Sequence, residues 1–178
     1  MTEQPGQPEA APPPPAPPWQ PPEPVAGPAP GYEFGDFGPR LVAYIIDGLI
    51  ITAAVIAVVL ILAIPFAGII GSGPQRQLTG PIAGFVVLVI LAVAVITLGY
   101  FPYFWTRGGA TPGMRMMGLK VVRDVDGGPL TTGQAVIRLI GYWVSSAVLY
   151  LGFIWVLIDK RRRGWHDLIA GTVVVKRV

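Results

Sequence analysis

The 178-residue sequence contains no cysteine and a single histidine, His166. Without cysteine the chain can form neither disulfides nor thiolate-based metal sites. One histidine also excludes a metal site built from several histidines of one chain. Charged residues make up only 13% of the sequence, whereas soluble domains carry about 25%. We therefore expect a membrane protein that holds no metal and no other cofactor.

Motifs of common enzymes are missing as well. The sequence has no G-x-x-x-x-G-K-[ST], no H-E-x-x-H and no G-x-S-x-G. Asp124, Asp126 and Asp159 are explained by a turn and a helix end, so we predict no enzymatic activity. A net charge of +3 could suggest nucleic acid, but in so apolar a chain cationic loops at the cytoplasmic membrane surface explain it. We predict the lipid bilayer as a partner and no nucleic acid.

Proline is concentrated at the N-terminus, where residues 1–39 hold 14 of the 20 prolines and no lysine or arginine. This composition predicts a disordered tail over residues 1–31 with polyproline II character. The tail lacks the cationic start and the apolar stretch of a signal peptide. The prolines around Trp19 could dock on an SH3- or WW-like groove, or form a solvated spacer. Aromatic residues in Gly31–Gly38 predict an anchor at the lipid headgroups.

Two long apolar runs predict transmembrane helices. The first run, Leu41–Ile64, has 24 residues and would be roughly 36 Å long as a helix, which is enough to cross a bilayer. We predict that it ends at Pro65 and that a loop follows as far as Gly80. The second span is predicted at about Pro81–Trp105, with an aromatic belt at its end and a kink at Pro102.

Short strands and a third apolar segment complete the predicted fold. Leu119–Val125 is typical of a strand that ends in a turn at residues 126–129, and Thr172–Lys176 is typical of a last strand. Between them, residues 132–158 form an apolar segment that a capping box at Thr131 opens. The fold class is therefore an all-α membrane protein with two full transmembrane helices, a third apolar segment and short cytoplasmic β-strands.

The third apolar segment could cross the membrane once or return as a re-entrant hairpin. A single crossing divides the 13 Lys and Arg residues into 6 and 7, which conflicts with the positive-inside rule. A return places 12 on one side and leaves only Arg76 on the other, and it also lets the two strands pair. The break would lie near Ser145-Ser146 or Gly152. We favour the return, with both termini cytoplasmic, although 27 apolar residues also suit one tilted helix.

A pattern of charged residues runs through these segments. Arg40 opens the first span, Asp47 lies seven residues further on, and Asp167 follows the only histidine. The supporting motifs, in chain order, are Gly-Ala-Thr-Pro-Gly (109–113), Gly-Leu-Lys-Val-Val (118–122), Asp-Gly-Gly-Pro-Leu (126–130), Arg138 and Ala-Gly-Thr-Val-Val-Val (170–175).

This pattern, which covers roughly residues 32–178, resembles the RDD family of small bacterial membrane proteins, named for one arginine and two aspartates. Met114 departs from the pattern, because relatives tend to carry lysine there, and the neighbouring Arg115 keeps the charge. The resemblance implies an RDD-like transmembrane domain in the bacterial inner membrane with a role in transport. The proline-rich tail is similar to those of actinobacterial membrane proteins.

Asp47 is the sharpest candidate for a functional residue. A carboxylate inside an apolar span costs about 2.5–3.5 kcal/mol on insertion scales, so it must face protein or water. Burial could raise its pKa and make it a cation or proton site. Alternatively, it could form a structural ion pair, with Arg40 or Arg138, or a hydrogen bond that fixes helix packing.

The remaining candidates surround Asp167. This carboxylate could cap a short helix, or pair with Arg115 or Arg138. His166 could handle a proton or simply pack. Arg138 could extend to the headgroups, or pair with Asp47 or Asp167. We predict one polar cluster that moves a cation, a proton or a small solute, formed by Arg40, Asp47, Arg138, His166 and Asp167.

Basic residues after the third apolar segment are predicted to face lipid headgroups, where each contributes about 1 kcal/mol with anionic lipids. They are Lys160, Arg161, Arg162 and Arg163. Two or three spans are few for a closed pathway, so transport would require a homo-oligomer or a membrane partner. Gly141-x-x-x-Ser145 allows close helix approach. The alternative function is a non-transporting scaffold or accessory subunit that recruits partners through its proline-rich tail and basic face.

Overall fold

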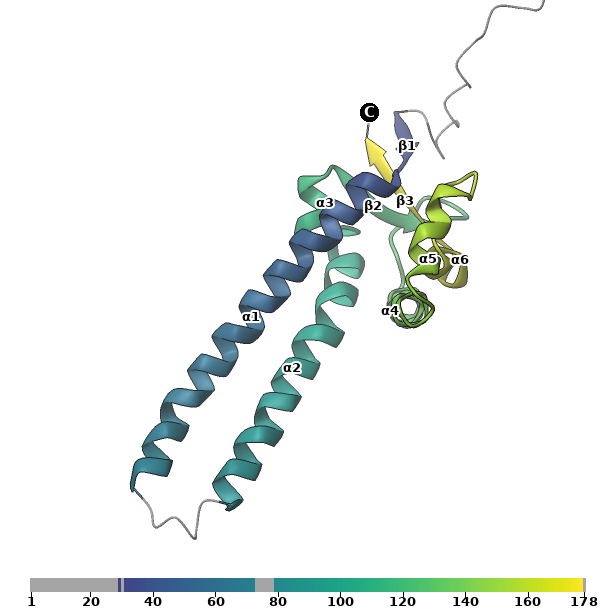
Figure 1. Ribbon diagram of the computed structural model, residues 1–178. Coiled ribbons are helices and arrows are strands. Elements are labelled where there is room, and N and C mark those ends of the chain that lie inside the picture. The colour runs from purple at the N-terminus through teal and green to yellow at the C-terminus, as the bar shows by residue number, and fades with distance from the viewer. Residues whose placement is uncertain (1–28, 30, 73–78, 178) are drawn as a thin grey trace, which may run out of the picture.

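A computed structural model describes residues 29, 31–72 and 79–177. The predicted disordered tail therefore lies almost entirely outside the described residues. Two long helices, α1 (Phe37–Ser72) and α2 (Thr79–Gly108), run side by side as a hairpin. The sheet and the shorter helices gather at one end of this hairpin (Figure 1).

The hairpin confirms the two predicted spans. Both α1 and α2 are long and apolar enough to cross a membrane. Large aliphatic side chains project outward along them, including Leu60, Ile64 and Val95, which are 60%, 75% and 73% exposed. Lipid can cover such a surface, whereas water would not tolerate so large an apolar patch. The chain is a membrane protein with two full transmembrane helices among its described residues.

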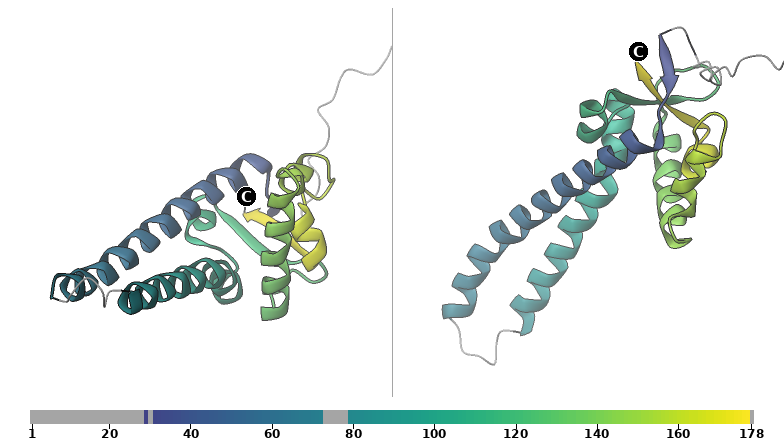
Figure 2. Two further views of the ribbon diagram at one scale, coloured as in Figure 1. Left: turned by 60° about the horizontal axis from the view of Figure 1, so that its bottom comes forward. Right: turned by 45° about the horizontal axis from the view of Figure 1, so that its top comes forward.

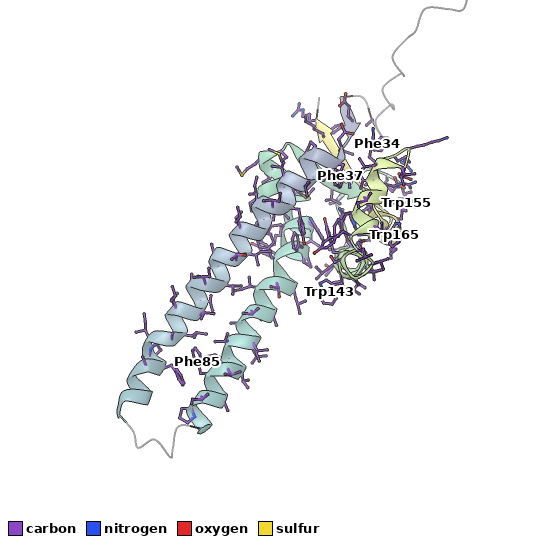
Figure 3. The ribbon with its side chains drawn as sticks, in the orientation of Figure 1. Phe34, Phe37, Phe85, Trp143, Trp155 and Trp165 are labelled. Carbon is purple, nitrogen blue, oxygen red and sulfur yellow. The ribbon has the colours of Figure 1, made fainter. Side chains whose placement is uncertain are left out.

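The predicted end of the first span at Pro65 is wrong, because α1 continues through this residue to Ser72. A proline removes one helical hydrogen bond, whereas ending the helix within hydrocarbon would leave several backbone groups unpaired. Phe66 then stacks on Phe85 of α2, with ring centroids 4.3 Å apart, and Figure 3 labels Phe85 between the two helices. The rest of the predicted loop, residues 73–78, lies outside the described residues.

A small antiparallel sheet contains both predicted strands. Among the described residues, β1 (Tyr32–Phe34), β2 (Leu119–Arg123) and β3 (Thr172–Arg177) are arranged in the order β1-β3-β2. The predicted pairing is confirmed, with Val122 opposite Val173.

β1 was not predicted as a strand. The segment expected to anchor in the headgroups instead pairs with β3, and the Phe34 side chain packs on Val122, Val173 and Val175. Because β3 carries a second edge, β1 satisfies backbone groups that would otherwise be left unpaired.

The third apolar segment is broken in the middle. α4 (Thr132–Ala147) begins with the predicted capping box of Thr131 and Gln134. A bend of 111° then leads into α5 (Leu151–Ile154) and the 3-10 helix η2 (Trp155–Leu157). Residues 148–150 form the break, between the two positions predicted for it. Figure 2 shows α4 strongly inclined to the long hairpin.

Ion pairs show that the segment returns to where it began. Arg161 and Arg163, after η2, pair with Asp124 at 2.7 and 3.1 Å, and Asp124 directly follows β2. Close packing closes the bend, because a Cβ on Gly152 would lie 2.2 Å from Ser145 Oγ and one on Gly141 would lie 2.7 Å from His166 Cα. The predicted close approach at Gly141 and Ser145 is confirmed.

Two short helices connect these parts. α3 (Pro112–Met116) lies between α2 and β2, and α6 (Trp165–Ala170) lies between η2 and β3. The main core lies where α1, α2 and α4 meet the sheet, and side chains fill this region in Figure 3. Its buried members are Ala43, Trp105, Ala110, Met114, Leu119, Val121, Leu130, Ala135, Leu139 and Val174.

Candidate functional site

Asp167 is the centre of a buried ion cluster. Arg40 Nη1 of α1 lies 2.6 Å from Asp167 Oδ2, and Arg138 Nη1 of α4 donates to Asp167 Oδ1. The N–H of Gly164 also donates to Oδ2 at 3.0 Å, because Asp167 occupies the third position of α6 and caps its first turn. The predicted capping and the predicted pairing with Arg138 are both confirmed. Arg115 lies elsewhere, with its guanidinium over the Phe104 ring.

The two arginines hold further parts of the chain. Arg40 donates from Nε to the Gly35 carbonyl at 2.9 Å and from Nη2 to the Arg162 carbonyl at 2.5 Å. Arg138 is 1% exposed and donates to Thr172 Oγ1 of β3 at 2.6 Å. Arg138 therefore does not extend to the headgroups. The cluster of Arg40, Arg138 and Asp167 joins α1, α4, α6 and β3 and carries a net charge of +1.

Asp167 remains ionised in the folded protein. Burial by itself would raise the pKa of this carboxyl, but the charges of Arg138 and Arg40 and the Gly164 hydrogen bond outweigh it. The pKa of Asp167 therefore lies well below its usual value. A carboxylate held in this way does not exchange protons near neutral pH.

His166, another predicted site residue, lies at this ion cluster. Its ring stacks on Tyr142 with centroids 4.4 Å apart and tilts against Phe153 at 5.0 Å. Burial lowers the pKa of His166 to about 3, a net result in which the charge of Asp167 opposes burial and the charges of Arg138 and Arg40 act in the same direction as burial. The histidine is therefore a neutral, packed side chain at neutral pH.

This buried histidine predicts acid destabilisation. Between pH 6.5 and 3 the unfolded chain binds a proton at His166 that the folded chain does not, so stability falls as the pH falls. From pH 7.5 to pH 5 the free energy of unfolding should drop by about 2 kcal/mol. Unfolding in mixed micelles at several pH values measures this. His166→Phe keeps the ring and should flatten the dependence, and an unchanged slope in this variant would contradict the assignment.

Asp47 lies apart from this ion cluster, which corrects the prediction of a single polar cluster. The carboxylate is 2% exposed and accepts hydrogen bonds from the Tyr100 hydroxyl at 2.8 Å, the Thr111 hydroxyl at 2.5 Å and the Gly113 N–H at 2.8 Å. The alternative ion pair with Arg40 or Arg138 is not formed. Both arginines are drawn instead to Asp167, which β3 and α6 place between them.

The contacts of Asp47 determine what it can do chemically. Its three partners are hydrogen-bond donors, whereas a cation site needs several further oxygen ligands. The carboxylate instead fastens the start of α3 to both transmembrane helices. A Cβ on Gly113 would lie 2.3 Å from the Ala43 carbonyl oxygen, so only glycine allows this approach.

Several residues of these two centres were missed in the sequence. Tyr100 was interpreted only as part of an aromatic belt, and Thr172 only as a strand residue. Thr111 had a usable signal, because a threonine directly before a proline is typical of a helix N-cap. Nothing in the sequence indicated that its hydroxyl would also bond a carboxylate 64 residues away.

The basic residues predicted to face lipid headgroups are mostly paired with acids. Arg161 and Arg163 contact Asp124, and Arg162 lies 3.3 Å from Asp36. Arg163 also donates to both oxygens of Asp159, and this hydrogen bonding lowers the pKa of that carboxyl. Lys160 is exposed. Lipid binding by these four residues stays a prediction.

A cavity of about 320 Å³ lies between the hairpin and the helices α4–α6. Arg40, Arg138, His166 and Asp47 line it, and the other lining residues are half aromatic and half aliphatic or methionine. The two polar centres are therefore separate in their contacts but border the same space. This cavity is the candidate functional site.

A comparison with known proteins identifies the family of this chain. The model of the RDD family matches residues 34–171, from β1 to the end of α6. The chain belongs to the RDD family. The family is named for one arginine and two aspartates. The residues that organise the two centres here, Arg40, Asp47 and Asp167, are of these types.

Curated relatives of this RDD protein are bacterial. It is 28% identical over 144 residues to the uncharacterized protein YxaI of Bacillus subtilis, a match that covers 76% of this chain and 93% of YxaI. It is also 28% identical over 94 residues to the proline-rich antigen homolog of Mycobacterium tuberculosis, covering 52% of this chain and 39% of that protein. No solved structure gives a significant match.

Proposed function

We propose that this RDD protein binds a small solute in the cavity beside α1, α2 and α4–α6 and moves it across the bacterial inner membrane. One observation carries the proposal: a 320 Å³ cavity borders both buried polar centres at the end of the transmembrane hairpin. Binding cavities typically combine apolar walls with a few polar groups in this way. The role requires no enzymatic step.

The contacts of both aspartates favour a solute over a proton or a metal cation. Asp47 already accepts three hydrogen bonds. Asp167 is held between two guanidinium groups, which keep it ionised. Each carboxylate already accepts three of the roughly four hydrogen bonds that its two oxygens can accept, so we assign both to holding the elements around the site and not to the transported species.

Transport would require more than one chain. Two full spans cannot enclose a path, and α1 and α2 leave large apolar side chains exposed along their length. We therefore propose a homo-oligomer, or a complex with another membrane protein, in which these faces contact neighbouring helices. Anionic lipids could add contacts at the exposed Lys160.

Uptake into proteoliposomes tests the proposal. We expect an organic solute to accumulate, while sodium and proton fluxes stay at the level of empty liposomes. Ala43→Leu, which fills the cavity wall, should abolish uptake, and Ala53→Leu on the exposed face of α1 should not. Sodium or proton flux that Asp47→Asn abolishes would refute this choice of transported species and restore a cation mechanism.

We further propose that the sheet and both termini face the cytoplasm. The return of residues 132–158 puts 12 of the 13 Lys and Arg residues on one side, as the positive-inside rule requires. Because the chain has no cysteine, single cysteines can report the side. Val125→Cys, at a 95% exposed position, should react only from the cytoplasm and Gly80→Cys only from outside. Labelling of both from the same face would contradict this orientation.

One observation favours the non-transporting alternative. The Asp167 cluster ties α1, α4, α6 and β3 together with buried charges, which suits a rigid platform on a membrane anchor. In that role the proline-rich tail and the basic face would recruit partners. Two results together would favour the platform. No class of solute would be taken up, and removal of residues 2–28 would abolish the function of the protein in cells.

A further inference from the structure

The walls of the cavity are unusually rich in aromatic rings. Phe101, Trp105, Tyr142 and Phe153 line it, as does Tyr44 of α1, whose ring centroid lies 6.2 Å from that of Tyr142. The rings form a continuous group, because Tyr142 stacks on Trp105 at 5.4 Å and on Phe101 at 5.7 Å. Flat aromatic walls favour a flat ligand, which can stack on a ring or meet its edge.

Among the described residues, three polar atoms of side chains that line the cavity have no hydrogen-bond partner: the donors Trp105 Nε1 and Arg138 Nε, and the ring nitrogen His166 Nδ1. Trp105 is fully buried and Arg138 is 1% exposed, yet neither Trp105 Nε1 nor Arg138 Nε makes a hydrogen bond within the described chain. Buried donors are nearly always satisfied, so orphaned ones require an explanation. The Arg138 guanidinium carbon lies over the Trp105 ring, 4.9 Å from its centroid, so the two side chains are in contact. An oxygen acceptor on a bound molecule would satisfy the two donors.

The volume limits the size of that molecule. An apolar cavity of about 150 Å³ accommodates benzene, so 320 Å³ accommodates roughly two fused rings with a small substituent. From the aromatic walls, the volume and the two unpartnered donors, we infer that the cavity binds a compact aromatic carboxylate. This names the class of solute for the proposed function and depends on the same cavity.

The charges bordering the cavity agree with an anion. Arg40, Arg138 and Asp47 line the cavity and together leave one positive charge, whereas Asp167, which pairs with both arginines, does not line it. Asp47 does line it, but its oxygens accept bonds from Tyr100, Thr111 and Gly113. The carboxylate of the ligand therefore binds at the Arg138 and Trp105 end, and its rings extend along Tyr142 toward Tyr44.

Equilibrium dialysis of the full chain in nanodiscs tests the inference, with empty nanodiscs as background. The probes share one ring system: 2-naphthoate, uncharged naphthalene and the cation 2-naphthylmethylammonium. We expect saturable binding of 2-naphthoate with at least about tenfold higher affinity than either analogue, because it alone offers a charged acceptor. Retention of 2-naphthoate at background level, or equal binding of the ammonium probe, would overturn the inference.

Two variants locate the bound probe. Trp105→Phe keeps an aromatic ring but removes Nε1, and should weaken 2-naphthoate about tenfold or more while leaving naphthalene unchanged. Ala43→Leu should abolish binding, and Ala53→Leu should leave it intact. Unchanged 2-naphthoate affinity in Trp105→Phe would overturn the placement even if Ala43→Leu fails to fold. Binding without uptake would leave this inference standing and remove only the transport proposal.

Discussion

Asp167→Asn should lower the free energy of unfolding by about 3–5 kcal/mol, the largest loss that we expect from any single substitution. The change leaves the buried Arg138 and the largely buried Arg40 guanidiniums without their shared counter-charge. An unpaired buried charge costs more than the ion pair itself contributes. Reversible unfolding in mixed micelles, followed by tryptophan fluorescence, measures the loss.

Asp126→Asn is the matched control for this substitution. Asp126 also pairs with an arginine, Arg123 at 2.7 Å, but its side chain is 52% exposed. Exposed pairs contribute little, so the control should change stability by less than about 1 kcal/mol. Equal effects of the two substitutions would show that the Asp167 cluster does not hold the helices to the sheet.

Asp47→Ala should cost roughly 2–4 kcal/mol, because it leaves the Tyr100 and Thr111 hydroxyls and the Gly113 N–H without their acceptor. The α3 helix should then loosen from the transmembrane hairpin. Asp47→Asn keeps one acceptor oxygen and should show an intermediate loss. Hydrogen exchange at residues 111–117, together with the unfolding measurement, would report both effects.

The control for Asp47→Ala is Asp36→Ala. The Asp36 side chain is 67% exposed, and its carboxylate lies 3.3 Å from the Arg162 guanidinium. It should leave stability nearly unchanged. If Asp47→Ala is as stable as the wild type and blocks a cation flux, Asp47 is a transport residue and not the fastening that its hydrogen bonds indicate. The two expected losses are independent, since the two carboxylates share no partner, and should add.

Both aspartates thus hold in place the elements around the cavity, although only Asp47 lines it. Each one fixes an element that the lipid-facing hairpin alone could not position: α3 in the case of Asp47, and α4 with β3 in the case of Asp167. Under the proposed function, the specificity of the cavity would depend on polar atoms that these contacts leave without a partner, among them Arg138 Nε and Trp105 Nε1.

Local chemistry explains why so much of the fold could be predicted. Long apolar runs must become helices in a bilayer, because each backbone group has to be paired within its own segment. The capping box at Thr131 and the two valine-rich strands are equally local signals. The failure at Pro65 has the same origin: in water a proline commonly ends a helix, but in lipid the helix continues past it.

The sequence by itself determined the two spans, the pairing of β2 with β3 and the charged members of the two polar centres, but not the hydroxyl groups of Tyr100, Thr111 and Thr172 that bond to them. Only the tertiary structure decided that Arg40 and Arg138 meet at Asp167 while Asp47 binds neutral donors from α2 and α3. It also decided that the third apolar segment turns back at residues 148–150. The physical reason is that a buried charge pairs with whichever partner the packing of distant segments brings within about 3 Å, and spacing along one helix cannot reveal that partner.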